Sequence, residues 1–89
     1  MSTLVVKPDE RVKQVSFDAD SICVDLMDGR RISAPLAWFP RLAAATATQL
    51  AQWELCAAGY GIHWEALDED ISTEGLLRGA PAPKAAAPV

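Results

Sequence analysis

The chain has 89 residues, of which 51% are hydrophobic and 22% are charged, and this composition predicts one small globular domain rather than a disordered chain. A chain of this length buries only about 60% of its unfolded surface, so the core is small and the protein is a candidate for self-association or for binding a partner. The formal net charge of −4 argues against direct nucleic-acid binding, which needs clustered Lys and Arg, and no window approaches the ~20 apolar residues of a transmembrane helix.

The chain ends and the cysteines favour a cytoplasmic protein. The N-terminal segment, residues 1–9, lacks the continuous apolar stretch of a secretory signal. Cys23 and Cys56 are far apart in the sequence and form no CxxC pair, which is typical of small buried thiols in a reducing compartment. Residues 10–79 are the expected domain, and residues 80–89, rich in Ala and Pro, are expected to be a disordered tail.

The first two strands are predicted at residues 12–17 and 22–27. Both are rich in β-branched and aromatic side chains, and the turn-like residues 18–21 separate them. In the second strand, the apolar residues Ile22, Val24 and Leu26 alternate with Cys23, Asp25 and Met27. This period of two predicts a half-buried strand.

The connection to a third strand has two interpretations, which differ in register. A two-residue turn at residues 28–29 would mix apolar and polar side chains on one face of the sheet. A three-residue loop at residues 27–29 pairs Val24 with Ile32 and keeps the apolar side chains together. The loop is preferred because it also uses Gly29 where a positive φ is needed.

The main helix is predicted in the middle of the chain. Pro35 cannot donate to a ladder and so ends the third strand, and Pro40 can open a short helical turn. Thr46 and Gln49 have the spacing of a capping box, so a helix is expected from there to about Ala58. Its inward stripe would consist of Leu50, Trp53 and Ala57.

A short strand and a short helix are expected to close the domain. Ile62 and Trp64 would lie on one face of the strand and His63 on the other. Ser72 can cap a final helical turn that Gly79 ends. The fold class is therefore α+β: a small antiparallel β-meander with one main helix, a short extra strand and a short C-terminal helix packed on it.

Acidic side chains are concentrated in the second half of the chain. Residues 42–77 contain no Lys or Arg but six acids, which are Glu54, Glu65, Asp68, Glu69, Asp70 and Glu74. Such a surface repels phosphate backbones and attracts a basic protein. Because three consecutive carboxylates repel one another, residues 68–70 are expected either to form a solvated loop or to find a cation, a backbone N–H cluster or a partner. The candidate internal cations are Arg41 and Arg30.

Trp38, Phe39 and Arg41 form a second candidate site. Aromatic and arginine side chains are good binding anchors, so these residues could be an exposed recognition patch. The alternative is that the aromatic rings cover one end of the sheet while Arg41 neutralises a nearby carboxylate, since a small domain needs such a lid.

His63 and Trp64 precede the acidic run and suggest either a metal site or an acid–base group. One histidine with carboxylates is a weak indication, because zinc sites usually draw on several Cys and His. The sequence shows no set of nucleophile, base and orienting residue and no glycine-rich phosphate loop. No catalytic residue, metal or cofactor is therefore expected, and the candidate binding residues are Trp38, Phe39, Arg41, His63, Trp64, Glu65, Asp68, Glu69 and Asp70.

Several sequence pieces carry a resemblance to a known family. In chain order they are Asp28-Gly29-Arg30, Pro35-Leu36, Trp38-Phe39-Pro40-Arg41-Leu42, Gly61-Ile62-His63-Trp64 and Leu67-Asp68-Glu69-Asp70-Ile71-Ser72. Together they resemble the small bacterial family catalogued as domain of unknown function 2442, over roughly residues 10–79. The resemblance implies a compact β-meander with helices packed on it and no assigned activity. It also implies a regulatory or antitoxin role, because some relatives carry a helix-turn-helix domain and others are encoded beside a small toxin-like protein.

The function expected from these features is a non-enzymatic protein-interaction module, an antitoxin-like partner of a small basic toxin. The alternative is a ligand-sensing domain that regulates transcription through a separate DNA-binding protein. A small hydrolase is the third hypothesis. A neighbouring gene for a short basic protein would favour the first, a bound metabolite the second, and dependence on phosphate or metal the third.

Overall fold

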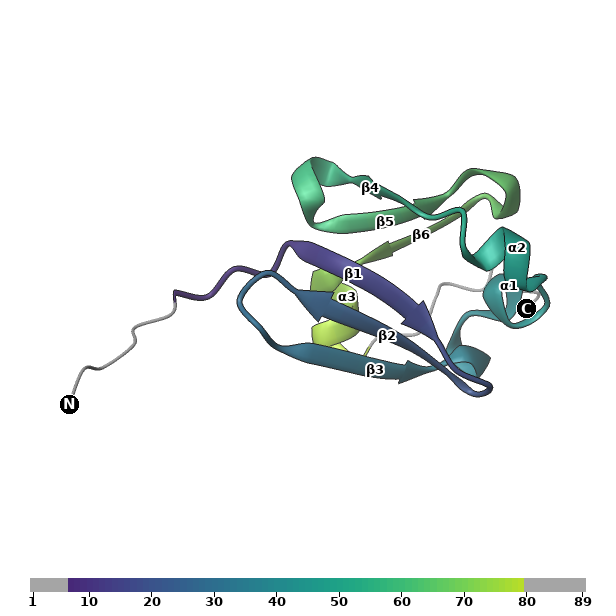
Figure 1. Ribbon diagram of the computed structural model, residues 1–89, viewed down its shortest axis with the longest axis horizontal. Helices are drawn as coiled ribbons and strands as arrows, with labels where there is room; N and C mark the ends of the chain where they lie inside the picture. The colour runs from purple at the N-terminus through teal and green to yellow at the C-terminus, as the bar shows by residue number, and fades with distance from the viewer. Residues whose placement is uncertain (1–6, 80–89) are drawn as a thin grey trace, which may run out of the picture.

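Two small antiparallel sheets and several short helices make up the described part of the chain, residues 7–79 of a computed structural model (Figure 1). The first sheet has the order β1-β2-β3 and the second the order β4-β5-β6. The strands are β1 (Val12–Phe17), β2 (Ser21–Leu26), β3 (Arg31–Pro35), β4 (Glu54–Cys56), β5 (Gly61–Trp64) and β6 (Glu69–Ser72). The predicted α+β class is confirmed.

The register of the first sheet follows the predicted three-residue loop. Val24 lies opposite Ile32 in the β2–β3 pair, and the Leu26 amide donates to the Arg30 carbonyl at 2.8 Å. Gly29 has a φ of +97°, a conformation that glycine adopts without strain. The apolar side chains of β2, Ile22, Val24 and Leu26, are all buried as a result.

Short helices connect and flank the strands. They are η1 (Leu36–Trp38), α1 (Pro40–Ala43), α2 (Ala47–Leu50), η2 (Ala57–Gly59), η3 (Glu65–Leu67) and α3 (Thr73–Arg78). Pro40 begins α1 as predicted. The Ser72 hydroxyl accepts from the Gly75 amide at 2.9 Å to cap α3, and Gly79 ends that helix in the left-handed conformation.

The prediction of a helix from Thr46 to Ala58 is wrong beyond its first turn. The capping box forms, with the Gln49 amide 3.1 Å from Thr46 Oγ1, but α2 ends at Leu50. The following residues instead form β4, in which Leu55 pairs with Ile62 of β5. Pairing in a sheet therefore outweighs local helix propensity here, as tertiary context commonly does.

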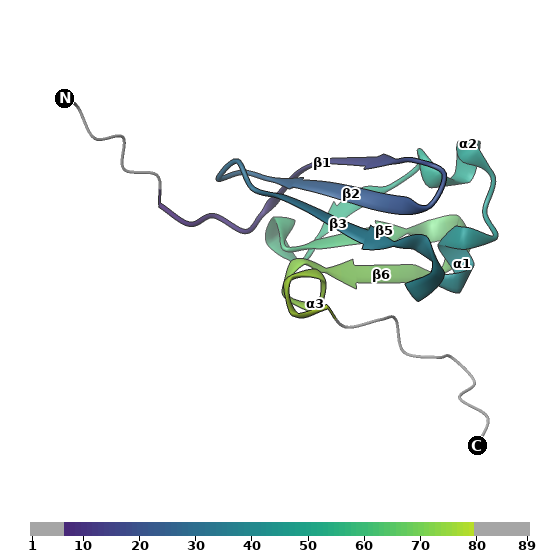
Figure 2. The same cartoon turned by 90° about the horizontal axis from the view of Figure 1, so that it is seen from below.

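The core lies between the two sheets, which form opposite layers in Figure 2. The α1 and α2 helices lie together at one end, and α3 lies toward the other, where it contacts both β3 and β6. Trp64 is 1% exposed, and its indole Nε1 donates to the Leu50 carbonyl at 3.1 Å. The same ring meets Phe17 edge-on, so side chains from both sheets and α2 share one core.

The sequence analysis also made predictions about the two chain ends and about transmembrane helices. Residues 1–6 of the N-terminal segment and the predicted tail, residues 80–89, lie outside the described residues. Within residues 7–79, no helix is long and apolar enough to cross a membrane.

Candidate functional site

An acidic row crosses the outer surface of the second sheet. The register places Glu54 of β4 opposite His63 of β5, and His63 opposite Asp70 of β6. Because Ile62 and Trp64 point into the core, His63 points outward, as the alternation of the strand predicts. Glu54 and Asp70 are exposed, so both carboxylates flank the imidazole on the solvent side.

His63 is held by two carboxylates. Its Nδ1 lies 2.5 Å from Asp70 Oδ1, and its Nε2 lies 2.9 Å from Oε1 of Glu65, which follows β5 in η3. These hydrogen bonds raise the pKa of His63 to about 9, Glu65 contributing most and Asp70 next. His63 is therefore an imidazolium at neutral pH, and both of its ring nitrogens donate.

Glu65 and Asp68 extend this surface beyond the row. Asp68 follows η3 with a φ of +51° and is exposed. We call Glu54, Glu65, Asp68 and Asp70 the acidic face. Among residues 7–79, His63 is the one cationic side chain paired with the row, and Arg41 reaches the face at Asp68.

Glu69 and Trp64 do not belong to this surface. The two residues pair across β5 and β6, and both point into the core. Glu69 is 7% exposed, and burial raises the pKa of its carboxyl while the charge of Arg41 lowers it. Neither side chain is available to a partner, although the sequence analysis named both as candidate binding residues.

Arg41 contacts the acidic run chiefly through the backbone. Its guanidinium donates to the Asp68 carbonyl, and Asp68 Oδ2 lies 3.9 Å from Nη1. That carboxylate is almost fully exposed, so solvent weakens the ion pair. Asp70 bonds His63 instead of Arg41.

The aromatic pair beside Arg41 belongs to the core. Phe39 is 2% exposed, and Trp38 is half-buried and packed against the same cluster. Of the two alternatives for this patch, the structure supports the lid over the end of the core. Arg41 is then the exposed residue of the three.

Sequence reasoning missed three exposed side chains on β4 and in the turn that follows it. Glu54 and Leu55 lie on β4, and Tyr60 immediately precedes β5. Leu55 and Tyr60 are 49% and 47% exposed. Because residues 46–58 carry the cap and spacing of a helix, no local signal placed these side chains on a sheet edge.

The Cys56 thiol also lies on the outer surface of this sheet. A Cβ built on the opposite Gly61 would lie 2.8 Å from the Cys56 sulfur, so the absence of a side chain at Gly61 leaves room for it. Burial raises the pKa of the thiol, and the charges of Asp70 and Glu54 raise it further. The sulfur therefore stays protonated and weakly nucleophilic at neutral pH.

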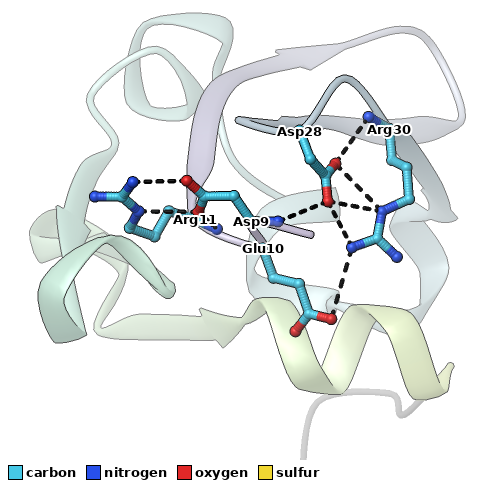
Figure 3. Close-up of polar contacts among 5 residues, drawn as sticks. All are labelled: Asp9, Glu10, Arg11, Asp28 and Arg30. Carbon is cyan, nitrogen blue, oxygen red and sulfur yellow. Dashed lines mark hydrogen bonds and ion pairs between the residues drawn. The ribbon is translucent and has the colours of Figure 1, made fainter. Parts of the chain in front are cut away.

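A second polar cluster lies at the β2–β3 loop, far from the acidic row in sequence (Figure 3). The Asp28 carboxylate accepts from the Asp9 amide at 2.9 Å and from Arg30 Nη2 at 2.8 Å. Arg30 also reaches Glu10 at 3.6 Å, and Arg11 bonds Asp9 at 2.6 Å. These contacts fix the chain entering β1 against the loop, which is a structural role.

A cleft of about 370 Å³ opens between β1 and α2. Its lining residues are Gln14, Val15, Ser16, Phe17, Ala47, Leu50, Ala51 and Trp53. The volume lies at the lower end of the range for small-molecule sites. Nothing in this lining is charged, so the cleft would suit an uncharged ligand.

Comparison with known proteins identifies relatives of unknown function. Residues 12–82 match the family model described as "Protein of unknown function (DUF2442)". A crystal structure of a protein of unknown function from Rhodospirillum rubrum is 35% identical, with a TM-score of 0.70 over 84% of this chain and 93% of that one. An NMR structure of an uncharacterized protein from Chromobacterium violaceum is 26% identical, with a TM-score of 0.70 over 83% of this chain and 70% of the other. No protein of curated function matches.

Proposed function

The chain belongs to the DUF2442 family of proteins of unknown function, and we propose that it is a non-enzymatic protein-interaction module, the antitoxin-like partner of a small basic toxin in a bacterial two-protein system. The observation that carries the proposal is the acidic face. Its four carboxylates are exposed on one sheet and its η3 loop, within a stretch that has no Lys or Arg. A surface of one charge sign steers a partner of the opposite sign toward it.

Two exposed apolar side chains at the edge of this sheet would supply contact area. Among the described strands β4 pairs with β5 alone and so is an edge strand. Leu55 lies opposite Ile62, on the core-facing side of this edge rather than on the acidic side, and Tyr60 lies at the turn into β5. Tyrosine is enriched among binding hot spots because it offers a large apolar ring with a polar end. In this proposal Leu55 and Tyr60 replace Trp38 and Phe39 as the apolar part of the interface.

A co-purification experiment with two charge-matched variants tests the proposal. Glu65→Gln with Asp68→Asn removes two charges from the acidic face, and Asp20→Asn with Glu74→Gln removes two exposed acids from other elements. Tagged protein from the native host should retain a short basic protein, identified by mass spectrometry. The face variant should lose this protein and the control variant should keep it. Equal recovery with both variants would contradict the proposal.

The cleft between β1 and α2 favours a second candidate function, a ligand-sensing domain that regulates transcription through a separate DNA-binding protein. A metabolite that remains bound through purification would be found by mass spectrometry of the denatured protein. Leu50→Trp, which fills the cleft, should abolish that binding while leaving the acidic face intact. Retention of the basic partner by this variant would separate the two functions.

A further inference from the structure

Two strands and one short helix bring nitrogen and oxygen donors together on the outer surface of the second sheet. Glu54, His63 and Glu65 each offer one donor atom, and these atoms all lie within 4.8 Å of one another. They come from β4, β5 and η3. Because β4 and β5 are hydrogen-bonded neighbours, their register fixes Glu54 beside His63, whereas the η3 turn brings Glu65 back over the imidazole.

The imidazole is oriented before any ligand arrives. Asp70 holds Nδ1 at 2.5 Å, which directs Nε2 toward Glu65, and a carboxylate oxygen of Glu54 lies within 4.8 Å of an imidazole nitrogen. The His63 side chain is 24% exposed, so the ring is confined while its Nε2 edge faces Glu65. A carboxylate that accepts from one imidazole nitrogen while the other binds a metal is the usual outer-shell arrangement at histidine metal sites.

The charges around the ring favour an added cation. Three carboxylates, those of Glu54, Glu65 and Asp70, surround one imidazole. Even with His63 protonated, this group of four side chains carries two excess negative charges. A divalent ion in place of the single proton on Nε2 would reduce that excess. Mixed imidazole and carboxylate ligands are typical of zinc and related transition metals, whereas magnesium and calcium prefer oxygen alone.

We propose that Glu54, His63 and Glu65 bind one divalent transition-metal ion of the zinc class, with Asp70 as the positioning residue for the imidazole. Three protein ligands leave a fourth position for water or for a donor from a partner. Binding moves the Nε2 proton to solvent, and the lone pair that it leaves forms the metal–nitrogen bond. This site goes beyond the proposed protein interaction and is tested with metal alone, so the two proposals fail independently.

Calorimetric titration of the full chain, freed of metal with a chelator and kept reduced, tests this site. Zn²⁺ should bind with a stoichiometry of one, and Mg²⁺ at the same concentration should bind at least tenfold more weakly. His63→Gln and Glu54→Gln should each weaken Zn²⁺ binding at least tenfold, and Asp70→Asn about 10- to 100-fold. Glu74→Gln, which changes an exposed glutamate of α3 paired with Arg78, should bind like the parent chain.

Nuclear magnetic resonance keeps the test decisive if a variant does not fold. In the parent chain, Zn²⁺ should shift the His63 imidazole nitrogen signals, the Nε2 signal more than the Nδ1 signal. The proposal is overturned if these signals do not move at one equivalent of Zn²⁺, or if Mg²⁺ binds as tightly as Zn²⁺. It is also overturned if a folded His63→Gln chain keeps its affinity while Cys56→Ser loses it, because the thiol would then be the ligand.

Discussion

His63 and Asp70 face each other across the β5–β6 pair, with the imidazole Nδ1 2.5 Å from the carboxylate Oδ1. Together with Glu65, Asp70 raises the pKa of His63 from 6.5 to about 9 in the folded protein. A histidine whose folded pKa is raised stabilises the fold fully below its unfolded pKa, and that contribution is lost as the pH rises through the folded value. The free energy of unfolding is therefore expected to fall between pH 6.5 and 9.

Urea unfolding at several pH values checks this expectation. The parent chain should lose stability over that interval, and His63→Gln should show a flatter profile because it has no proton to lose there. The His63 signals in NMR spectra should titrate with a midpoint near pH 9. A midpoint near the ordinary histidine value, with parallel stability profiles, would show that the two carboxylates do not hold the ring in solution.

Glu69 should affect the pH dependence of stability from a lower pH than His63 does. Burial raises the pKa of this carboxyl in the folded state, so the charged form is disfavoured and stability falls as the pH rises above 4.5. Glu69→Gln should flatten the profile above pH 4.5 and raise the melting temperature at pH 7. A lower melting temperature at pH 7 would mean that Arg41 more than offsets the cost of burying the charge.

The indole of Trp64 anchors α2 to the second sheet. Its Nε1 donates to the Leu50 carbonyl at 3.1 Å, and the side chain is 1% exposed. Trp64→Phe removes this donor and leaves a void, so the free energy of unfolding should fall by about 2–4 kcal/mol. Chemical denaturation measures the loss. A change below 1 kcal/mol would indicate that α2 is not held through this contact.

The Asp28 carboxylate should matter more for stability than an ordinary surface acid. It accepts from the Asp9 amide and from Arg30, whereas the exposed Arg31–Asp25 pair is the matched control from the same sheet. Asp28→Ala should lower the melting temperature by roughly 5 °C, and Arg31→Ala by about a degree or less. Equal effects in thermal scans would show that the loop cluster adds nothing beyond a surface ion pair.

The first sheet was predictable because its turn chemistry and its side-chain alternation agree. Gly29 allows the three-residue loop, and that loop keeps Val24 and Ile32 on the same face. The caps at Thr46 and Ser72 were predictable for the same reason, because each depends on side chains within three residues. Local interactions of this kind can be predicted from short stretches of sequence.

The β4 strand was not predictable, because the short turn that joins it to β5 carries no sequence signal for a hairpin. Residues 46–58 begin with a helix cap, but Leu55 pairs with Ile62, and Ala57 and Ala58 adopt positive φ values in the turn between the strands. Alanine gives no signal for that conformation. Since Glu54 lies on the strand that was not predicted, the sequence analysis named His63 and Asp70 as site residues but did not place Glu54 beside them.

Association kinetics at two salt concentrations test the proposed interaction most directly. With the basic partner immobilised, the parent chain should associate at least tenfold faster at 50 mM than at 300 mM salt, about the range expected for electrostatic steering. Glu65→Gln with Asp68→Asn should slow association at low salt and flatten this dependence, whereas Asp20→Asn with Glu74→Gln should change it much less. Leu55→Ala should mainly speed dissociation. Association that is indifferent to salt, or equally affected by both charge variants, would contradict a role for the acidic face.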